Sequence, residues 1–204
     1  LGTVKHPVPR AGLGCAACAP SGGRRSHSRR CATGITPGRG CQDSSDPSHK
    51  GSCCRFVFLD AVVHAFDDPA CCPELSVTRS FQLIGDSLTL VRATTRLSNG
   101  QERVIAIESP LDGAETRGEL VITGRVTIAP FENTLTVRVY NEQGNELFAG
   151  PITVNAPDFG AAGTFSVTLD TSGFPIGRVR IVIADLSAAD GFVLALDSVQ
   201  VVVR

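Results

Sequence analysis

The chain has 204 residues, 42% of them hydrophobic, and a formal net charge of −1, so it has room for one ordinary domain and a smaller unit. No stretch approaches the roughly 20 apolar residues of a membrane-spanning helix, and we expect no such segment. The charge is unevenly placed. Residues 1–55 carry nine Lys or Arg and two acidic residues, while residues 56–204 carry ten basic and eighteen acidic residues. All eight Cys and all four His precede residue 73, so the two halves follow different chemistry.

Residues 1–55 are poor in large apolar side chains and rich in Gly, Ser, Pro and Cys. This composition buries too little surface to offset the entropy of ordering the chain, so we expect a disordered tail or residues translated outside the genuine gene. The basic run at residues 24–30 lacks interleaved aromatic residues for base stacking, which argues against nucleic-acid binding. The chain contains no Met and no apolar leader core, and we expect the true N-terminus to lie upstream.

Cysteine usage leaves more than one interpretation open. Cys15 and Cys18 have the spacing of half a zinc site, but no second pair follows at the usual distance, and Cys31, Cys41 and His27 would have to complete it. A cysteine-rich metal-binding or redox protein carried on a β-sandwich is therefore the alternative function. Structural cross-linking is the default expectation, with no metal site or cofactor assigned. The disulfide candidates are Cys53, Cys54, Cys71 and Cys72.

Residues 56–100 contain three strand-like segments. Residues 56–63 are rich in β-branched and aromatic side chains, and residues 75–84 and 87–97 flank a Gly-Asp pair with turn character. An Asn-Gly turn signal at 99–100 marks a linker to the next domain. We expect a β-hairpin remnant of a small domain in this region.

Residues 67–90 begin with Asp-Asp-Pro-Ala-Cys-Cys-Pro and continue into a strand-like run. This segment resembles one found near the end of small secreted bacterial domains. The resemblance implies that residues 56–100 are the remainder of such a secreted domain.

The letters Gly-Asp-Ser-Leu at 85–88 match the nucleophile block of a lipase and esterase family. A serine such as Ser87 is a weak nucleophile without a histidine base, and in that family the base lies downstream. No histidine follows His64 in this chain. We therefore interpret residues 85–86 as a hairpin turn, assign no catalytic residue and expect no enzyme.

Residues 104–204 contain seven short segments, most of which alternate apolar and polar residues. A period of two places one face in a core and the other in water. Turn signals separate the segments every 8–15 residues, as in a two-sheet sandwich. The positions expected to face the core are Ile105, Ile107, Leu120, Ile122, Val126, Ile128, Leu135, Val137, Val139, Leu147, Ile152, Val154, Phe165, Val167, Leu169, Val179, Ile181 and Ile183.

The last of these segments changes phase. Its first apolar residues, Phe192, Leu194 and Leu196, occupy even positions, whereas the later valines occupy odd ones. One extra residue near Asp197 and Ser198 would restore the alternation, so the pattern predicts a β-bulge there.

Several runs in residues 104–204 resemble the immunoglobulin-like domain of bacterial spore germination proteins. They include Ile-Glu-Ser-Pro-Leu-Asp-Gly at 107–113, Pro-Phe-Glu-Asn-Thr-Leu-Thr-Val-Arg-Val at 130–139, and Asp-Ser-Val-Gln-Val-Val-Val at 197–203. The resemblance implies an immunoglobulin-like sandwich and a secreted or cell-surface module without assigned catalytic residues. Its partner would be an unidentified protein or cell-envelope ligand.

Two loops of this domain combine an aromatic ring with a carboxylate, as a recognition surface does. The candidate binding residues are Phe131, Glu132, Asn133, Asp158 and Phe159. The alternative, which the sequence favours, is that the two rings cap the core and the acids accept hydrogen bonds from backbone N–H groups in turns.

Overall fold

The computed structural model describes residues 56–66, 68–84 and 86–204, which belong to one structural unit. Strands dominate these residues, accompanied by one short 3-10 helix and no α-helix, which confirms the all-β prediction. The predicted disorder of residues 1–55 lies outside the described residues. The elements are β1 (Phe56–Val63), β2 (Leu75–Ile84), β3 (Ser87–Arg96), β4 (Glu102–Arg103), β5 (Ile105–Ser109), β6 (Ala114–Thr116), β7 (Glu119–Val126), η1 (Phe131–Asn133), β8 (Thr134–Asn141), β9 (Glu146–Asn155), β10 (Gly163–Asp170), β11 (Gly177–Leu186) and β12 (Val193–Val203).

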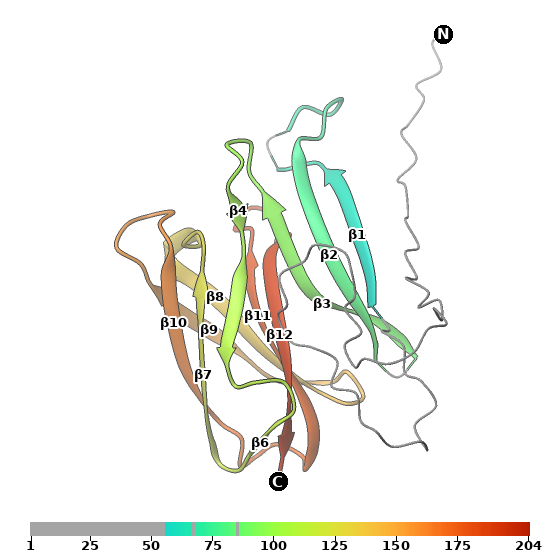
Figure 1. Ribbon diagram of the computed structural model, residues 1–204, viewed down its shortest axis with the longest axis vertical. Coiled ribbons are helices and arrows are strands. Elements are labelled where there is room, and N and C mark those ends of the chain that lie inside the picture. The colour runs from blue at the N-terminus through green and yellow to red at the C-terminus, as the bar shows by residue number, and fades with distance from the viewer. Residues whose placement is uncertain (1–55, 67, 85) are drawn as a thin grey trace, which may run out of the picture. The chain divides into compact units, whose positions relative to one another are not determined.

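Two sheets of mostly antiparallel strands face each other over a common core (Figure 1). The first sheet runs β1-β2-β3-β12-β11-β8-β9, with β4 beside β3 and β6 parallel to β12. The second sheet runs β9-β10-β7-β5, because Val154 and Asn155 at the end of β9 pair with β10 while the rest of β9 pairs with β8. One strand therefore belongs to both sheets, and the predicted immunoglobulin-like two-sheet sandwich is confirmed.

The main core lies between the sheets and consists of the inward-facing residues that the alternation predicts. Burial of one such aliphatic side chain contributes roughly 1.5–3 kcal/mol to stability. Strands β8 and β11 supply its centre because they lie in the middle of the sandwich part of the first sheet. Their inward residues are Leu135, Val137, Val139, Val179, Ile181 and Ile183, each at most 2% exposed.

Strand β12 departs from the sequence prediction. Asp197 and Ser198 keep continuous register with β11, so the predicted bulge at these residues is wrong, and the irregularity falls at Leu194 instead. Leu196 packs with Ala93 on the outer face of the first sheet, while the odd-numbered valines after it face the core. The phase change therefore has two causes: the extra residue at Leu194, and the apolar neighbours that cover both faces of β12 at Leu196.

The first three strands extend the first sheet beyond the sandwich. β1 pairs with β2 over its whole length, and β2 and β3 form a hairpin in which Ile84 pairs with Ser87. This register agrees with the predicted turn between the two strands. β3 then joins β12 through the pairs Ala93 with Leu196 and Arg92 with Asp197.

Strand β8 connects the two ends of the sandwich. It begins at Thr134, directly after η1, and ends at Asn141, where the turn to β9 starts. The connections β7–β8 and β9–β10 therefore lie at one end of the sandwich, and the β8–β9 turn lies at the other. The candidate binding residues all belong to the first end.

Candidate functional site

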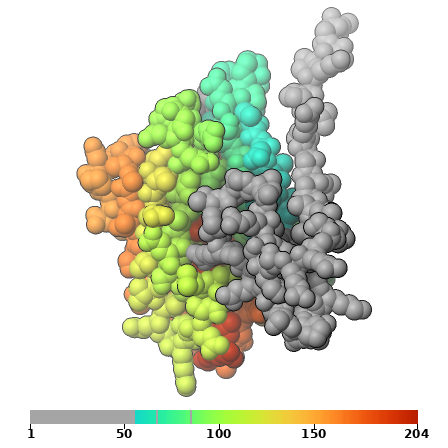
Figure 2. Space-filling view, in the orientation of Figure 1, coloured from blue at the N-terminus to red at the C-terminus, as the bar shows by residue number. Residues whose placement is uncertain are grey.

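The two predicted recognition loops lie against each other. The backbone N–H of Ala129, in the β7–β8 connection, donates a 2.7 Å hydrogen bond to the carbonyl of Ala161 in the β9–β10 connection. Each loop is also closed by a bond of its own, from Asn133 N to Pro130 O at 3.0 Å and from Ala161 N to Asp158 O at 3.2 Å. Figure 2 shows the orange β9–β10 segment projecting beside yellow atoms of the β7–β8 segment. The two loops thus form one surface, here called the loop surface and defined by residues 129–133 and 156–162.

Both aromatic rings of the loop surface are exposed to solvent. Phe131 is 58% exposed and Phe159 is 75% exposed, so the expectation that these rings cap the core is wrong. The reason is that Ile128 and Ala129 already fill the buried positions before η1, and the chain turns outward after them. Exposed aromatic side chains on fixed loops are typical of binding surfaces.

The backbone of η1 adopts a conformation that L-residues avoid. Glu132 and Asn133 both have φ of 54°, where a side chain costs about 1–2 kcal/mol relative to the right-handed region. In addition, Oδ1 of Asn133 is buried without a hydrogen-bond partner in the part of the chain that the structure describes. Backbone strain and unpaired buried polar atoms gather at binding sites, because function and not stability selects them.

The two acids of the loop surface differ in their surroundings. Oδ1 of Asp158 accepts a 2.7 Å hydrogen bond from the N–H of Phe159, as expected for an acid in a turn. Glu132 is exposed, and it is its carbonyl, not its carboxylate, that accepts a 3.1 Å bond from Oγ1 of Thr134. The surface therefore offers two rings and two carboxylates, a combination suited to an apolar ligand with basic groups.

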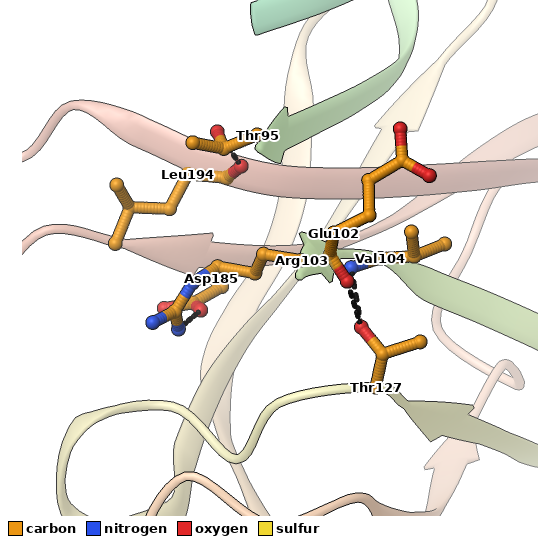
Figure 3. A network of polar contacts seen from close by, with 7 residues as sticks. All are labelled: Thr95, Glu102, Arg103, Val104, Thr127, Asp185 and Leu194. Carbon is orange, nitrogen blue, oxygen red and sulfur yellow. Dashed lines mark hydrogen bonds and ion pairs between the residues drawn. The ribbon is translucent and has the colours of Figure 1, made fainter. Parts of the chain in front are cut away.

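A network of polar contacts fastens the strands next to the loop surface (Figure 3). Oγ1 of Thr127 donates to the carbonyl of Glu102 at 2.5 Å and accepts from the N–H of Val104 at 2.9 Å. Arg103, which lies between Glu102 and Val104, donates from Nη1 to Oδ2 of Asp185 at 2.5 Å. These bonds hold the β7–β8 connection to β4, and β4 to β11.

The Arg103–Asp185 pair is buried, with side chains 17% and 4% exposed. Burial raises the pKa of the Asp185 carboxyl, and the adjacent Arg103 guanidinium offsets part of that rise. This pair was not predicted from the sequence, although one signal was present: Asp185 continues the inward phase of Val179, Ile181 and Ile183. A charged residue in the phase of a core strand predicts a buried partner.

The cysteines singled out in the sequence lie only partly within the described residues. The structure joins Cys71 to its neighbour Cys72 by a disulfide, while Cys53 and Cys54 lie outside the described residues. The cysteines of the alternative metal site also lie outside them. Within residues 56–66, 68–84 and 86–204 there is no group of three or more His, Cys, Asp or Glu that could hold a metal ion.

Comparison with known families agrees with the fold. The family model for the immunoglobulin-like domain of bacterial spore germination matches residues 104–192. The sandwich is therefore similar to this spore-germination domain over residues 104–192. The loop surface and the Arg103–Asp185 pair fall within or at the edge of this immunoglobulin-like domain, whose matched range ends just before β12.

No curated protein matches the chain. No helix with the length and apolar character of a membrane span occurs in the described part of the chain.

Proposed function

We propose that the immunoglobulin-like domain is a non-enzymatic binding module that works outside the cytoplasm and contacts a cell-envelope protein through its loop surface. The observation that carries this proposal is the exposure of Phe131 and Phe159 on two loops that a backbone hydrogen bond holds together. A rigid aromatic anchor loses little conformational entropy on binding, and aromatic residues are enriched among the residues that dominate binding energy. The two carboxylates beside the rings favour a partner with basic groups.

The absence of an enzymatic role is part of the same proposal. Residues 104–204 contain no His, Cys or Lys, and these side chains carry most acid–base and nucleophilic chemistry near neutral pH. Ser87 of the lipase-like motif lies at the start of β3, directly after the hairpin turn. A fluorophosphonate probe is therefore expected to label the protein no more than a Ser87→Ala variant.

Two observations support a location outside the cytoplasm. Disulfides persist mainly in oxidising compartments, and Cys71 and Cys72 form one. The family match is to a domain described from bacterial spore germination. The location is tested by fusing the chain, behind a secretion signal, to a reporter that folds only after export and comparing it with a cytoplasmic fusion; stable accumulation of the cytoplasmic form alone would contradict it.

The binding proposal is tested by sedimentation of the purified full chain with isolated bacterial envelopes. We expect the protein to cosediment, and the double variant Phe131→Ser with Phe159→Ser to bind at least about tenfold more weakly, since hot-spot residues contribute 2 kcal/mol or more. The matched control is Leu111→Ser with Ile176→Ser, because these side chains are 65% and 83% exposed but belong to other loops.

Two outcomes would contradict this proposal. Equal binding of the loop-surface variant and the native protein would show that the two rings are not the contact. Binding that survives protease treatment of the envelopes would show that the partner is not a protein.

A further inference from the structure

A second candidate site lies at the other end of β8. A groove of about 490 Å³ is formed where the tip of the β2–β3 hairpin approaches the β8–β9 turn and the outer face of β11 and β12. Its size is in the range of small-molecule sites. The hairpin contributes Ser87 and Thr89, the turn contributes polar residues 141–144, and β11 contributes two arginines. With Gln200 of β12, the groove is therefore built by segments from four parts of the sequence.

Arg180 is the most firmly held side chain of the groove. Strand register places it between Gln200 and Tyr140 on the outer face of the first sheet. Its guanidinium carbon lies 4.9 Å from the centre of the Tyr140 ring, and its Nη1 donates a 3.3 Å hydrogen bond to the carbonyl of Leu90. These two contacts fix the guanidinium before any ligand binds.

The charge of Arg180 has no acidic partner in the described part of the chain. Its side chain is half-buried, and this desolvation lowers the pKa of the guanidinium, while Tyr140 acts in the opposite direction. A guanidinium has five N–H donors, and one of them is bonded to Leu90. Most of its hydrogen-bonding capacity, and all of its charge, is therefore open to a ligand.

Two neighbours add donors of the same kind. Arg178 stands two residues earlier on the same face of β11, is exposed, and forms no ion pair within the described residues. Oδ1 of Asn141 accepts bonds from the N–H groups of Gln143 at 3.0 Å and Asn145 at 2.8 Å, which leaves its amide N–H₂ as a donor. Among the described lining residues Glu142 is the one acid, and it is exposed on the turn.

We propose that this groove binds an acidic oligosaccharide, with a sugar carboxylate held by Arg178 and Arg180. Arginine binds carboxylates through paired N–H···O bonds. The remaining lining is mostly side-chain amides and hydroxyls, from Asn141, Gln143 and Gln200 among others, which match the donors and acceptors of sugar hydroxyls. A free phosphate would leave these neutral groups unused.

The probe is trigalacturonic acid, titrated calorimetrically into the full chain, and its fully methyl-esterified form is the matched neutral ligand. We expect the acid to bind and the ester to bind at least about tenfold more weakly, because the ester loses the charge-assisted hydrogen bonds. Arg178→Gln and Arg180→Lys should each weaken binding of the acid by about tenfold. Arg125→Gln is the control, since Arg125 lies on the second sheet in an exposed pair with Glu108.

The outcomes separate this site from its alternatives. Equal affinity for acid and ester would overturn the proposal, as would equal affinity of Arg125→Gln and Arg178→Gln. A triglutamate peptide or inorganic phosphate that binds as tightly as trigalacturonate would overturn the saccharide assignment. Arg180→Lys is accompanied by a thermal melt, and if that variant is unfolded, the exposed Arg178→Gln carries the test. The variant lacking Phe131 and Phe159 should bind trigalacturonate normally, so failure at either site does not affect the other.

Discussion

Arg103 and Asp185, 82 positions apart in sequence, form a 2.5 Å ion pair that joins β4 to β11. The pair lies where the chain leaves the β1–β3 extension and enters the sandwich. Nε of Arg103 is buried without a hydrogen-bond partner among the described residues, so Asp185 is the main compensation for burying this cation. Removing one member therefore leaves an uncompensated charge.

Replacing Arg103 by Met is expected to destabilise the protein by about 2–4 kcal/mol at pH 7, because it leaves the Asp185 carboxylate buried without its cation. Chemical denaturation measures the loss. Arg96→Met is the control, since the Arg96–Glu102 pair is 3.9 Å apart and exposed, and exposed pairs contribute about 0–1 kcal/mol. Similar losses in both variants would contradict the role of the buried pair.

The loss of stability caused by Arg103→Met should depend on pH. Burial raises the folded-state pKa of Asp185 above its ordinary value of 3.8, so the folded protein binds this proton more tightly than the unfolded chain does. The associated stability is full below pH 3.8 and declines as the pH rises through the folded-state pKa. Loss of Arg103 raises that pKa further, so the destabilisation by Arg103→Met should grow upward from about pH 4. This pH dependence should vanish when Arg103→Met is made in the Asp185→Asn variant, because the Asp185 carboxyl is then absent.

Gly124 of β7 lies beneath the ring of Phe165. A Cβ at Gly124 would clash with this ring and with the carbonyl of Ala106, so Gly124→Ala should cost about 3 kcal/mol through overpacking. Gly173→Ala is the matched control, because nothing lies within 4 Å of a Cβ there. The midpoints of thermal unfolding of the two variants give the comparison, and equal midpoints would show that the second sheet accommodates a Cβ at this position.

Thr127→Val removes both hydrogen bonds of the Thr127 hydroxyl while keeping the shape of the side chain. We expect a loss of about 1 kcal/mol and faster amide exchange at Val104, whose N–H loses its acceptor. Thr153→Val is the control, since Thr153 is exposed on β9 and its hydroxyl has no hydrogen bond in the described structure. Unchanged exchange at Val104 would contradict a fastening role for Thr127.

Glu132→Gly should stabilise the protein by roughly 0.5–1 kcal/mol, because glycine adopts φ of 54° without the steric cost that a side chain incurs. The same substitution at Glu119, exposed in the extended strand β7, should destabilise it by a similar amount. Opposite signs in urea titrations of the two variants would support strain at the loop surface. A loss of stability in Glu132→Gly would contradict it.

The sandwich could be predicted from local sequence patterns alone. Alternation in residues 104–204 identified nearly every residue of the main core, since a period of two is a local property that any strand with one buried face must show. Glycine-containing and proline-containing turns placed the strand boundaries for the same local reason. The pattern misplaced the irregularity of β12, because apolar residues on both covered faces hide the position of the extra residue, which is Leu194.

Which polar residues contact one another became visible only in the folded protein. The loop residues Phe131 and Phe159 could be named from the sequence, but the exposure of Phe131 follows from Ile128 and Ala129 having filled the buried positions before it. The Arg103–Asp185 pair and the groove at Arg180 join segments about 80 or more residues apart. Such contacts depend on strand order and register between distant segments, which a local pattern of apolar and polar residues does not encode.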